Sequence, residues 1–337
     1  MNKTVKILAV LLAVQLLLAV GVGFSKRDVT ATKESVALVS FDAEKIDRIS
    51  LEGPENAKVT LAKRKGNWVL PDSGKFPASN NKVKQLLERL KSLRSGTPVA
   101  TSSGARERFK VSDEAYERRI TLSEGKDAIA RLYLGSSPSR RLIHARSKDS
   151  DAIYAVKLAA YDVPVKGPDW EDKTILTLPK SAITSIGVQG LTLKLSAPAV
   201  NGDSKADKTS PPPVWHAEGL AKGRQLKAGA VDKLVGLLAN LQFEKVLGHE
   251  AKDEYDMTAP VLELTLTRNA SETLTYRVGK TRDKEQYTLK VSNRPEYFQL
   301  ASYKAKPLIE SASLKNLTKT MTKEEEEKTT SEQPSKP

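Results

Sequence analysis

The chain has 337 residues, a formal net charge of +14 and a sequence pI near 9.6, and 39% of its residues are hydrophobic. This length predicts about two domains, each large enough to bury a core. There is no cysteine, which excludes disulfide bonds, thiolate metal sites, cysteine nucleophiles and a lipid anchor on an N-terminal cysteine.

The N-terminal segment contains a continuous apolar run. Ile7 to Phe24 is 18 residues long, with Gln15 as its only markedly polar side chain. A helix of this length spans about 27 Å, close to the ~30 Å hydrocarbon core of a bilayer. We expect residues 1–24 to be a transmembrane signal-anchor in the inner (cytoplasmic) membrane, with the bulk of the chain periplasmic. The alternative is a cleaved signal peptide, because Gly21-Val22-Gly23 offers small residues where cleavage occurs.

After a polar spacer at residues 25–40, a first module is predicted over residues 41–163. Alternating apolar residues from Ile46 to Leu51 are typical of a strand. Lys65-Gly66-Asn67 then predicts a hairpin turn leading into Trp68. The next segment, Asn80 to Leu93, has helical spacing, with apolar residues at Val83, Leu86, Leu87, Leu90 and Leu93.

Two further hairpins are predicted after this helix, at residues 119–134 and 142–156. The order of strands, one helix and more strands predicts an α+β module, in which the helix packs on an antiparallel sheet. A linker is expected at residues 164–178, with Trp170 as an aromatic anchor.

The remaining chain repeats this pattern over a second module at residues 179–310. Trp215 corresponds to Trp68, and Val231 of the second apolar stripe follows Val83 by 148 residues. A polar, proline-rich insert at residues 197–213 lengthens the second copy. The predicted fold is therefore α+β with two tandem repeats, followed by a disordered polar tail at residues 311–337.

Two sequence segments resemble a bacterial envelope family catalogued as domain of unknown function 4340. They are Trp68-Val69-Leu70 with the apolar stripe that follows it, and Asp169-Trp170-Glu171-Asp172-Lys173 before a new strand. The family is similar in layout, with an N-terminal membrane helix. A segment of the form Tyr-Gly-Leu-x-x-Pro follows the helix in that family. The second copy has Tyr255 to Pro260 there, whereas the first has only Phe109-Lys110-Val111.

Members of the family are often encoded beside ABC-type transporters. The resemblance therefore implies an accessory role in the envelope, with protein partners in an ABC-type complex. It supplies no catalytic residues.

The sequence offers no recognisable catalytic motif. The three histidines, His144, His216 and His249, share no metal-ligand spacing. There is no Gly-x-Ser-x-Gly elbow and no phosphate-binding Gly-x-x-x-x-Gly-Lys-[Ser/Thr] motif. We therefore expect no catalytic residue, no metal and no cofactor, and a protein that is not an enzyme.

Arginine is concentrated in the second half of the first module. Its guanidinium group can hold carboxylate or phosphate, so these residues are candidate contacts for a partner protein or for an anionic lipid or glycan. A solvated basic surface is the alternative, and nucleic acid is not expected because aromatic residues are not interleaved with the charges. The candidates are Arg118, Arg119, Arg131, Arg140, Arg141 and Arg146.

The three tryptophans, Trp68, Trp170 and Trp215, are expected to be structural. The primary functional hypothesis is a membrane-anchored periplasmic accessory or scaffold protein without enzymatic activity. The alternative is a binding module for an anionic envelope polymer or lipid. A cell-wall hydrolase is a second alternative, because the spacing of a carboxylate pair is set only in three dimensions.

Overall fold

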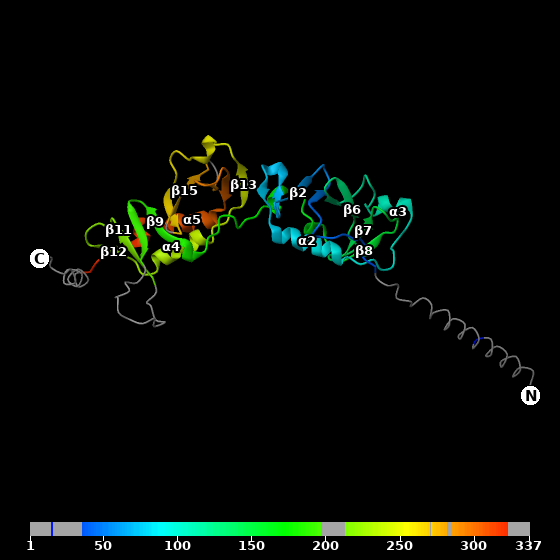
Figure 1. The fold of residues 1–337 in the computed structure, drawn as a ribbon, viewed down its shortest axis with the longest axis horizontal. Coiled ribbons are helices and arrows are strands. Elements are labelled where there is room, and N and C mark those ends of the chain that lie inside the picture. Colours follow the sequence, from blue (N-terminus) through cyan, green and yellow to red (C-terminus); the bar gives the residue numbers. More distant parts are fainter. Residues whose placement is uncertain (1–14, 16–35, 197–212, 270, 282–284, 323–337) are drawn as a thin grey trace, which may run out of the picture. The chain divides into compact units, whose positions relative to one another are not determined.

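A computed structural model describes residue 15 and residues 36–196, 213–269, 271–281 and 285–322 of the chain. The chain divides into two compact units between Trp170 and Glu171 (Figure 1). Each unit contains its own eight-stranded antiparallel sheet with few helices, so the fold is α+β.

The sheet of the first unit has the strand order β4-β3-β2-β1-β5-β6-β7-β8. Strand β1 therefore joins two antiparallel meanders that lie on either side of it. The strands are β1 (Arg48–Glu52), β2 (Lys58–Arg64), β3 (Asn67–Leu70), β4 (Phe76–Pro77), β5 (Arg118–Glu124), β6 (Asp127–Leu134), β7 (Ile143–Ser147) and β8 (Tyr154–Val156).

Alternation along these strands directs one set of side chains into the core. Ile49 of β1 is fully buried and stands opposite Leu61 of β2 and Leu122 of β5. The turn predicted between β2 and β3 is present: Lys65 and Gly66 have φ of 49° and 84°. Two successive residues with positive φ match the twist of the flanking strands in a two-residue hairpin.

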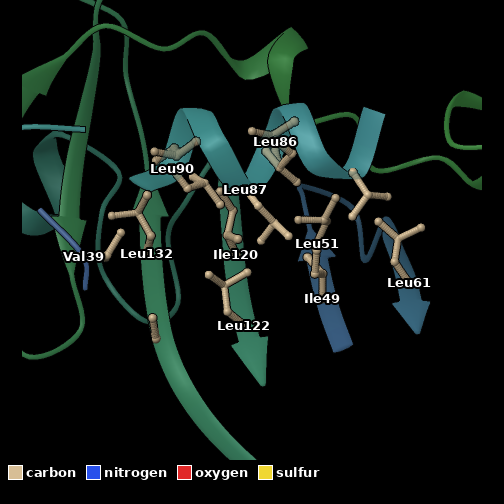
Figure 2. Close-up of a cluster of buried hydrophobic side chains, with 14 of the residues drawn as sticks. Val39, Ile49, Leu51, Leu61, Leu86, Leu87, Leu90, Ile120, Leu122 and Leu132 are labelled. Carbon is tan, nitrogen blue, oxygen red and sulfur yellow. The ribbon is translucent and has the colours of Figure 1, made fainter. Parts of the chain in front are cut away.

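One helix, α2 (Asn80–Ser92), covers this apolar face of the sheet. Ser79 caps it, because its Oγ accepts a hydrogen bond from the Lys82 amide at 3.4 Å. Figure 2 shows Leu86, Leu87 and Leu90 above the core-facing residues of β1, β2, β5 and β6. The other helical segments of this unit are η1 (Pro71–Ser73), α3 (Ser103–Arg108), η2 (Ala160–Asp162) and η3 (Gly167–Asp169), where η denotes a 3₁₀ helix.

The sheet of the second unit has the order β11-β10-β9-β14-β15-β16-β17-β13. Its strands are β9 (Ile183–Val188), β10 (Leu191–Ser196), β11 (Val214–Glu218), β13 (Lys245–Gly248), β14 (Leu262–Arg268), β15 (Glu272–Lys280), β16 (Tyr287–Val291) and β17 (Tyr297–Leu300). A separate pair joins β12 (Arg224–Leu226) to β18 (Thr318–Thr320).

The two sheets repeat each other strand by strand. The orders β3-β2-β1-β5-β6-β7-β8 and β11-β10-β9-β14-β15-β16-β17 correspond throughout. The register is also preserved, because Ile49 pairs with Leu122 in the first unit and Ile186 pairs with Leu266 in the second. The tandem repeat predicted from the sequence is thus present in the sheet architecture.

The second unit departs from the prediction of one main helix per repeat. Besides α4 (Ala230–Ala239) it contains α5 (Ser302–Ser311), which packs against α4, and a short helix α6 (Leu314–Leu317). Two 3₁₀ segments complete it, η4 (Lys180–Ala182) and η5 (Asp253–Tyr255). Helix α5 was not predicted because it contains Pro307 and alternates lysine with small residues.

The prediction of a disordered tail from residue 311 is wrong for residues 311–322. Ala312 and Leu317 are fully buried, and β18 pairs with β12. These contacts are made with distant residues, so the polar local composition did not reveal them. Outside the described residues lie the rest of the predicted tail, residues 197–212 of the predicted insert, and the apolar run Ile7–Phe24 apart from Gln15. Within the described residues, no helix has the length and apolar character needed to cross a membrane.

Candidate functional site

Three of the candidate arginines, Arg119, Arg131 and Arg146, and one tyrosine, Tyr133, lie on the sheet face opposite to helix α2. Arg119 of β5 stands across from Tyr133 of β6, which in turn stands across from Arg146 of β7. Tyr133 is fully buried in a small second cluster of the first unit, together with Val111 and Ile153. The segment around helix α3 therefore covers this row of side chains rather than leaving it open to solvent.

Arg146 is a packing residue inside this cluster. Only 2% of it is exposed, and its Nε donates a hydrogen bond to the Val111 carbonyl at 2.7 Å. Its guanidinium group lies 4.6 Å from the centroid of the Tyr133 ring, a cation–π contact. The Tyr133 hydroxyl donates to the Asp113 carboxylate, which lowers the pKa of Asp113, and Arg146 acts in the same direction. These contacts leave Arg146 inaccessible to a partner.

Arg119 and Arg131 are also engaged within the first unit. Arg119 forms an ion pair with Glu52, and its guanidinium lies 4.8 Å from the Tyr116 ring centroid. Arg131 is half-buried beside the hydroxyl of Tyr133. Arg140 and Arg141 differ from them, because both are exposed between β6 and β7, and no side-chain partner for either is found in the described part of the chain.

Arg118, at the start of β5, lines a cleft in the first unit. The cleft has a volume of about 590 Å³ and lies between helix α2 and residues 161–170, which we call the strap. Helix α2 contributes Lys82, Gln85, Leu86 and Arg89, and the strap contributes Tyr161, Asp162, Pro164, Val165, Lys166, Asp169 and Trp170. This volume is in the range of ligand-binding pockets.

Two interactions hold the strap beside the helix. Arg89 forms an ion pair with Asp162, and Lys82 Nζ donates to the Asp169 carbonyl at 2.8 Å. Four basic and two acidic side chains line the cleft, so its formal charge is positive. Of these cations, only Arg118 is among the contact residues predicted from the sequence. The i, i+3, i+7 spacing of Lys82, Gln85 and Arg89 on the polar face of the helix was the signal that could have located the cleft.

The three tryptophans differ in burial. Trp68 and Trp170 are 7% and 2% exposed and belong to the core of the first unit. The Trp170 indole donates to the Pro164 carbonyl at 2.9 Å, and its own carbonyl accepts from the Ser79 amide at 2.8 Å. Trp170 thus ties the strap to the start of α2. Trp215 on β11 is half-buried in the second unit.

The three histidines have different surroundings. His144 is buried against Phe109, with ring centroids 4.3 Å apart, and its Nδ1 lies 3.0 Å from Ser136 Oγ. His216 and His249 are exposed in the second unit. Within the described ranges, no group of three or more histidine, aspartate and glutamate residues is arranged to hold a metal ion.

Comparison with known proteins places the chain in one family. The family described as domain of unknown function (DUF4340) matches residues 68–260, which is more than half of the chain. The chain therefore belongs to this family, as the resemblance in the tryptophan and leucine motifs indicated. No curated protein and no solved structure matches the chain.

Proposed function

We propose that this protein is a non-enzymatic accessory protein of the cell envelope, anchored in the inner membrane, whose two modules dock components of an ABC-type transport or envelope complex. The observation that carries the proposal is the pair of repeated sheets whose surfaces have diverged. The sheets keep the same strand order and register, and the first has a cleft of about 590 Å³ beside its main helix, α2.

The charged groups of the first module support a binding role. Glu52 and Asp113, the carboxylates nearest the arginine row, are engaged by Arg119, Tyr133 and Arg146. The hydrogen bond from Tyr133 and the charge of Arg146 lower the pKa of Asp113, so its carboxylate stays ionised and is a poor proton donor at neutral pH. The arrangement stabilises the fold and leaves the rims of the module for contact with other molecules.

The location is part of the same proposal. The apolar run Ile7–Phe24 is long enough to span a bilayer. The expected arrangement has both modules outside the cytoplasm, linked to the membrane by this run. In that position they can reach the extracytoplasmic surface of a permease.

Co-purification tests the proposal. The full-length tagged chain should be extracted in detergent from its native cells, and the recovered proteins searched for the ATPase and permease of an ABC-type transporter. We expect both transporter components to be recovered with the tagged chain, and not with an equally tagged single-pass protein of unrelated sequence. Recovery of the chain without them would contradict the docking role.

Protease treatment of spheroplasts tests the location. If the modules lie outside the cytoplasm, added trypsin should digest the chain in intact spheroplasts while a cytoplasmic marker survives. Protection of the chain until the membrane is lysed would contradict the proposed location.

A further inference from the structure

The cleft of the first module contains an arginine, Arg118, that forms no ion pair with a carboxylate of the described residues. Arg118 is half-buried, and its Nε donates to the Val163 carbonyl at 2.8 Å while Nη1 donates to the Glu117 carbonyl at 2.5 Å. Burial lowers its pKa, and Glu117 only partly opposes this effect. Arginine nevertheless remains charged, so an anion entering the cleft would meet a cation already positioned by the backbone.

Two lysines extend this positive surface. Lys82 uses one of its donors on the Asp169 carbonyl, and Lys166 lies exposed on the strap. The lining of the cleft also includes the apolar side chains Leu86, Val165 and Trp170. The cleft thus combines donors for an acidic group with apolar surface for its neighbours.

The two modules differ in the segment that follows the last strand of the meander. The segment that follows its last meander strand forms helix α5, which packs against α4. In the first module the segment after β8 forms the strap, which has only 3₁₀ turns, and the cleft remains beside α2. At the helix position where α2 has Arg89, α4 has Leu237, 148 residues later. In the second repeat this segment packs on the main helix as a helix, whereas in the first repeat a basic cleft lies between this segment and the main helix.

We propose that this cleft binds a short acidic segment of a partner protein, with a carboxylate at Arg118, Lys82 and Lys166 and apolar side chains against Leu86 and Val165. A peptide is favoured as the occupant because the corresponding segment of the second repeat packs against its main helix, α4, as helix α5. The inference rests on the proposed function, since it names the chemistry of the docked partner.

The three tryptophans provide the test, because only Trp170 lines the cleft. The full-length chain is expressed with fluorotryptophan and purified in detergent micelles. Its three ¹⁹F signals are assigned from the signal that is lost in Trp68→Phe and in Trp215→Phe. The probes are acetyl-Leu-Glu-Leu-Leu-amide, its Gln analogue and glycerol phosphate. The Glu peptide should shift the Trp170 signal and leave the Trp68 and Trp215 signals unchanged. The Gln peptide should bind roughly tenfold more weakly.

Variants distinguish binding in the cleft from nonspecific attraction of the peptide to a basic protein. Lys166→Glu, at an exposed position, and Arg118→Gln should each weaken the Glu peptide roughly tenfold, whereas Arg140→Glu should leave binding unchanged. Equal shifts with both peptides, or no shift of Trp170, would overturn the proposal. A stronger response to glycerol phosphate would assign the cleft to a phosphate headgroup instead. If the transporter components co-purify with the chain but the peptide does not shift the Trp170 signal, the partner binds outside the cleft. The docking role and the peptide-binding cleft can therefore fail separately.

Discussion

Two glycines occupy the same tight backbone approach in the two repeats. A Cβ on Gly135 would lie 1.9 Å from the Phe109 carbonyl oxygen, and a Cβ on Gly279 would lie 1.9 Å from that of Tyr255. In each repeat the residue after the aromatic is left-handed, with φ of 56° at Lys110 and 51° at Asp256. Phe109-Lys110-Val111 is therefore the structural counterpart of Tyr255-Asp256-Met257, although the first copy lacks the proline.

The close contact of each glycine with a backbone carbonyl predicts the effect of adding a methyl group. Gly135→Ala and Gly279→Ala should each destabilise the protein by about 1–3 kcal/mol, because the new Cβ collides with backbone that cannot rotate away. Gly104→Ala is the control, since nothing lies within 4 Å of its Cβ position and alanine favours helix α3. Urea unfolding measures all three free energies. Stability of the first two variants equal to that of Gly104→Ala would contradict the steric argument.

Tyr276 predicts a loss of stability in alkali. Burial raises its pKa to about 12 from an ordinary value of 10. The folded state thus favours the neutral phenol, so this stabilisation is complete below pH 10 and is lost as the pH rises from 10 to about 12. A shift of this size corresponds to roughly 2–3 kcal/mol.

The unfolding free energy of the second module should therefore fall over this pH interval, and less so in Tyr276→Phe. Tyr303→Phe is the matched control, because Tyr303 is 76% exposed. Urea unfolding at a series of pH values gives the comparison. An identical alkaline loss in Tyr276→Phe and the wild-type chain would refute the assignment to Tyr276.

At the level of elements, local patterns explain which parts the sequence could predict. Helix α2 was predicted because one stripe of leucines coincides with a serine cap, and both signals lie within the segment itself. Helix α6 and strand β18 were missed because their stability comes from distant partners. Arg224, for example, donates to Thr318 Oγ1 at 2.6 Å across 94 positions of sequence.

Two leucines of helix α6 test the corrected C-terminal boundary. Leu317 is fully buried, whereas Leu314 is 40% exposed. Leu317→Ala should destabilise the second module by about 2–5 kcal/mol through the loss of packing. Leu314→Ala should change it by less than about 0.5 kcal/mol, as expected for an exposed position. Thermal and urea unfolding distinguish them, and equal effects would show that α6 contributes little to the core.

At the scale of the whole molecule, the duplication was accessible from sequence and the cleft was not. Tryptophan and leucine recur at matching positions in the two repeats, and the two sheets have the same register. This was predictable because side chains that face a core recur at regular spacing in the sequence. The cleft depends instead on where the strap passes beside α2, which is set by single contacts such as Arg89 with Asp162. Arg118 was identified by residue type, but its neighbours Lys82 and Lys166 were not.

The division between the units supplies a final prediction. Residues 164–178 were expected to be a linker. Trp170, however, belongs to the core of the first unit and is hydrogen-bonded to Ser79 and Pro164. A fragment of residues 36–170 should therefore fold alone. A fragment of residues 36–163 should be less stable by about 3–5 kcal/mol, the cost of removing a buried aromatic side chain.

Trp170→Ala in the full chain should destabilise the first module by a similar amount. Trp215→Ala is the control and should leave the first module unaffected, because Trp215 belongs to the second unit. Circular dichroism and urea unfolding compare the fragments and variants. If the 36–163 fragment matched the stability of the 36–170 fragment, the strap would be an appendage rather than part of the core. The cleft would then lack a fixed wall, because its strap side is held in place through Trp170.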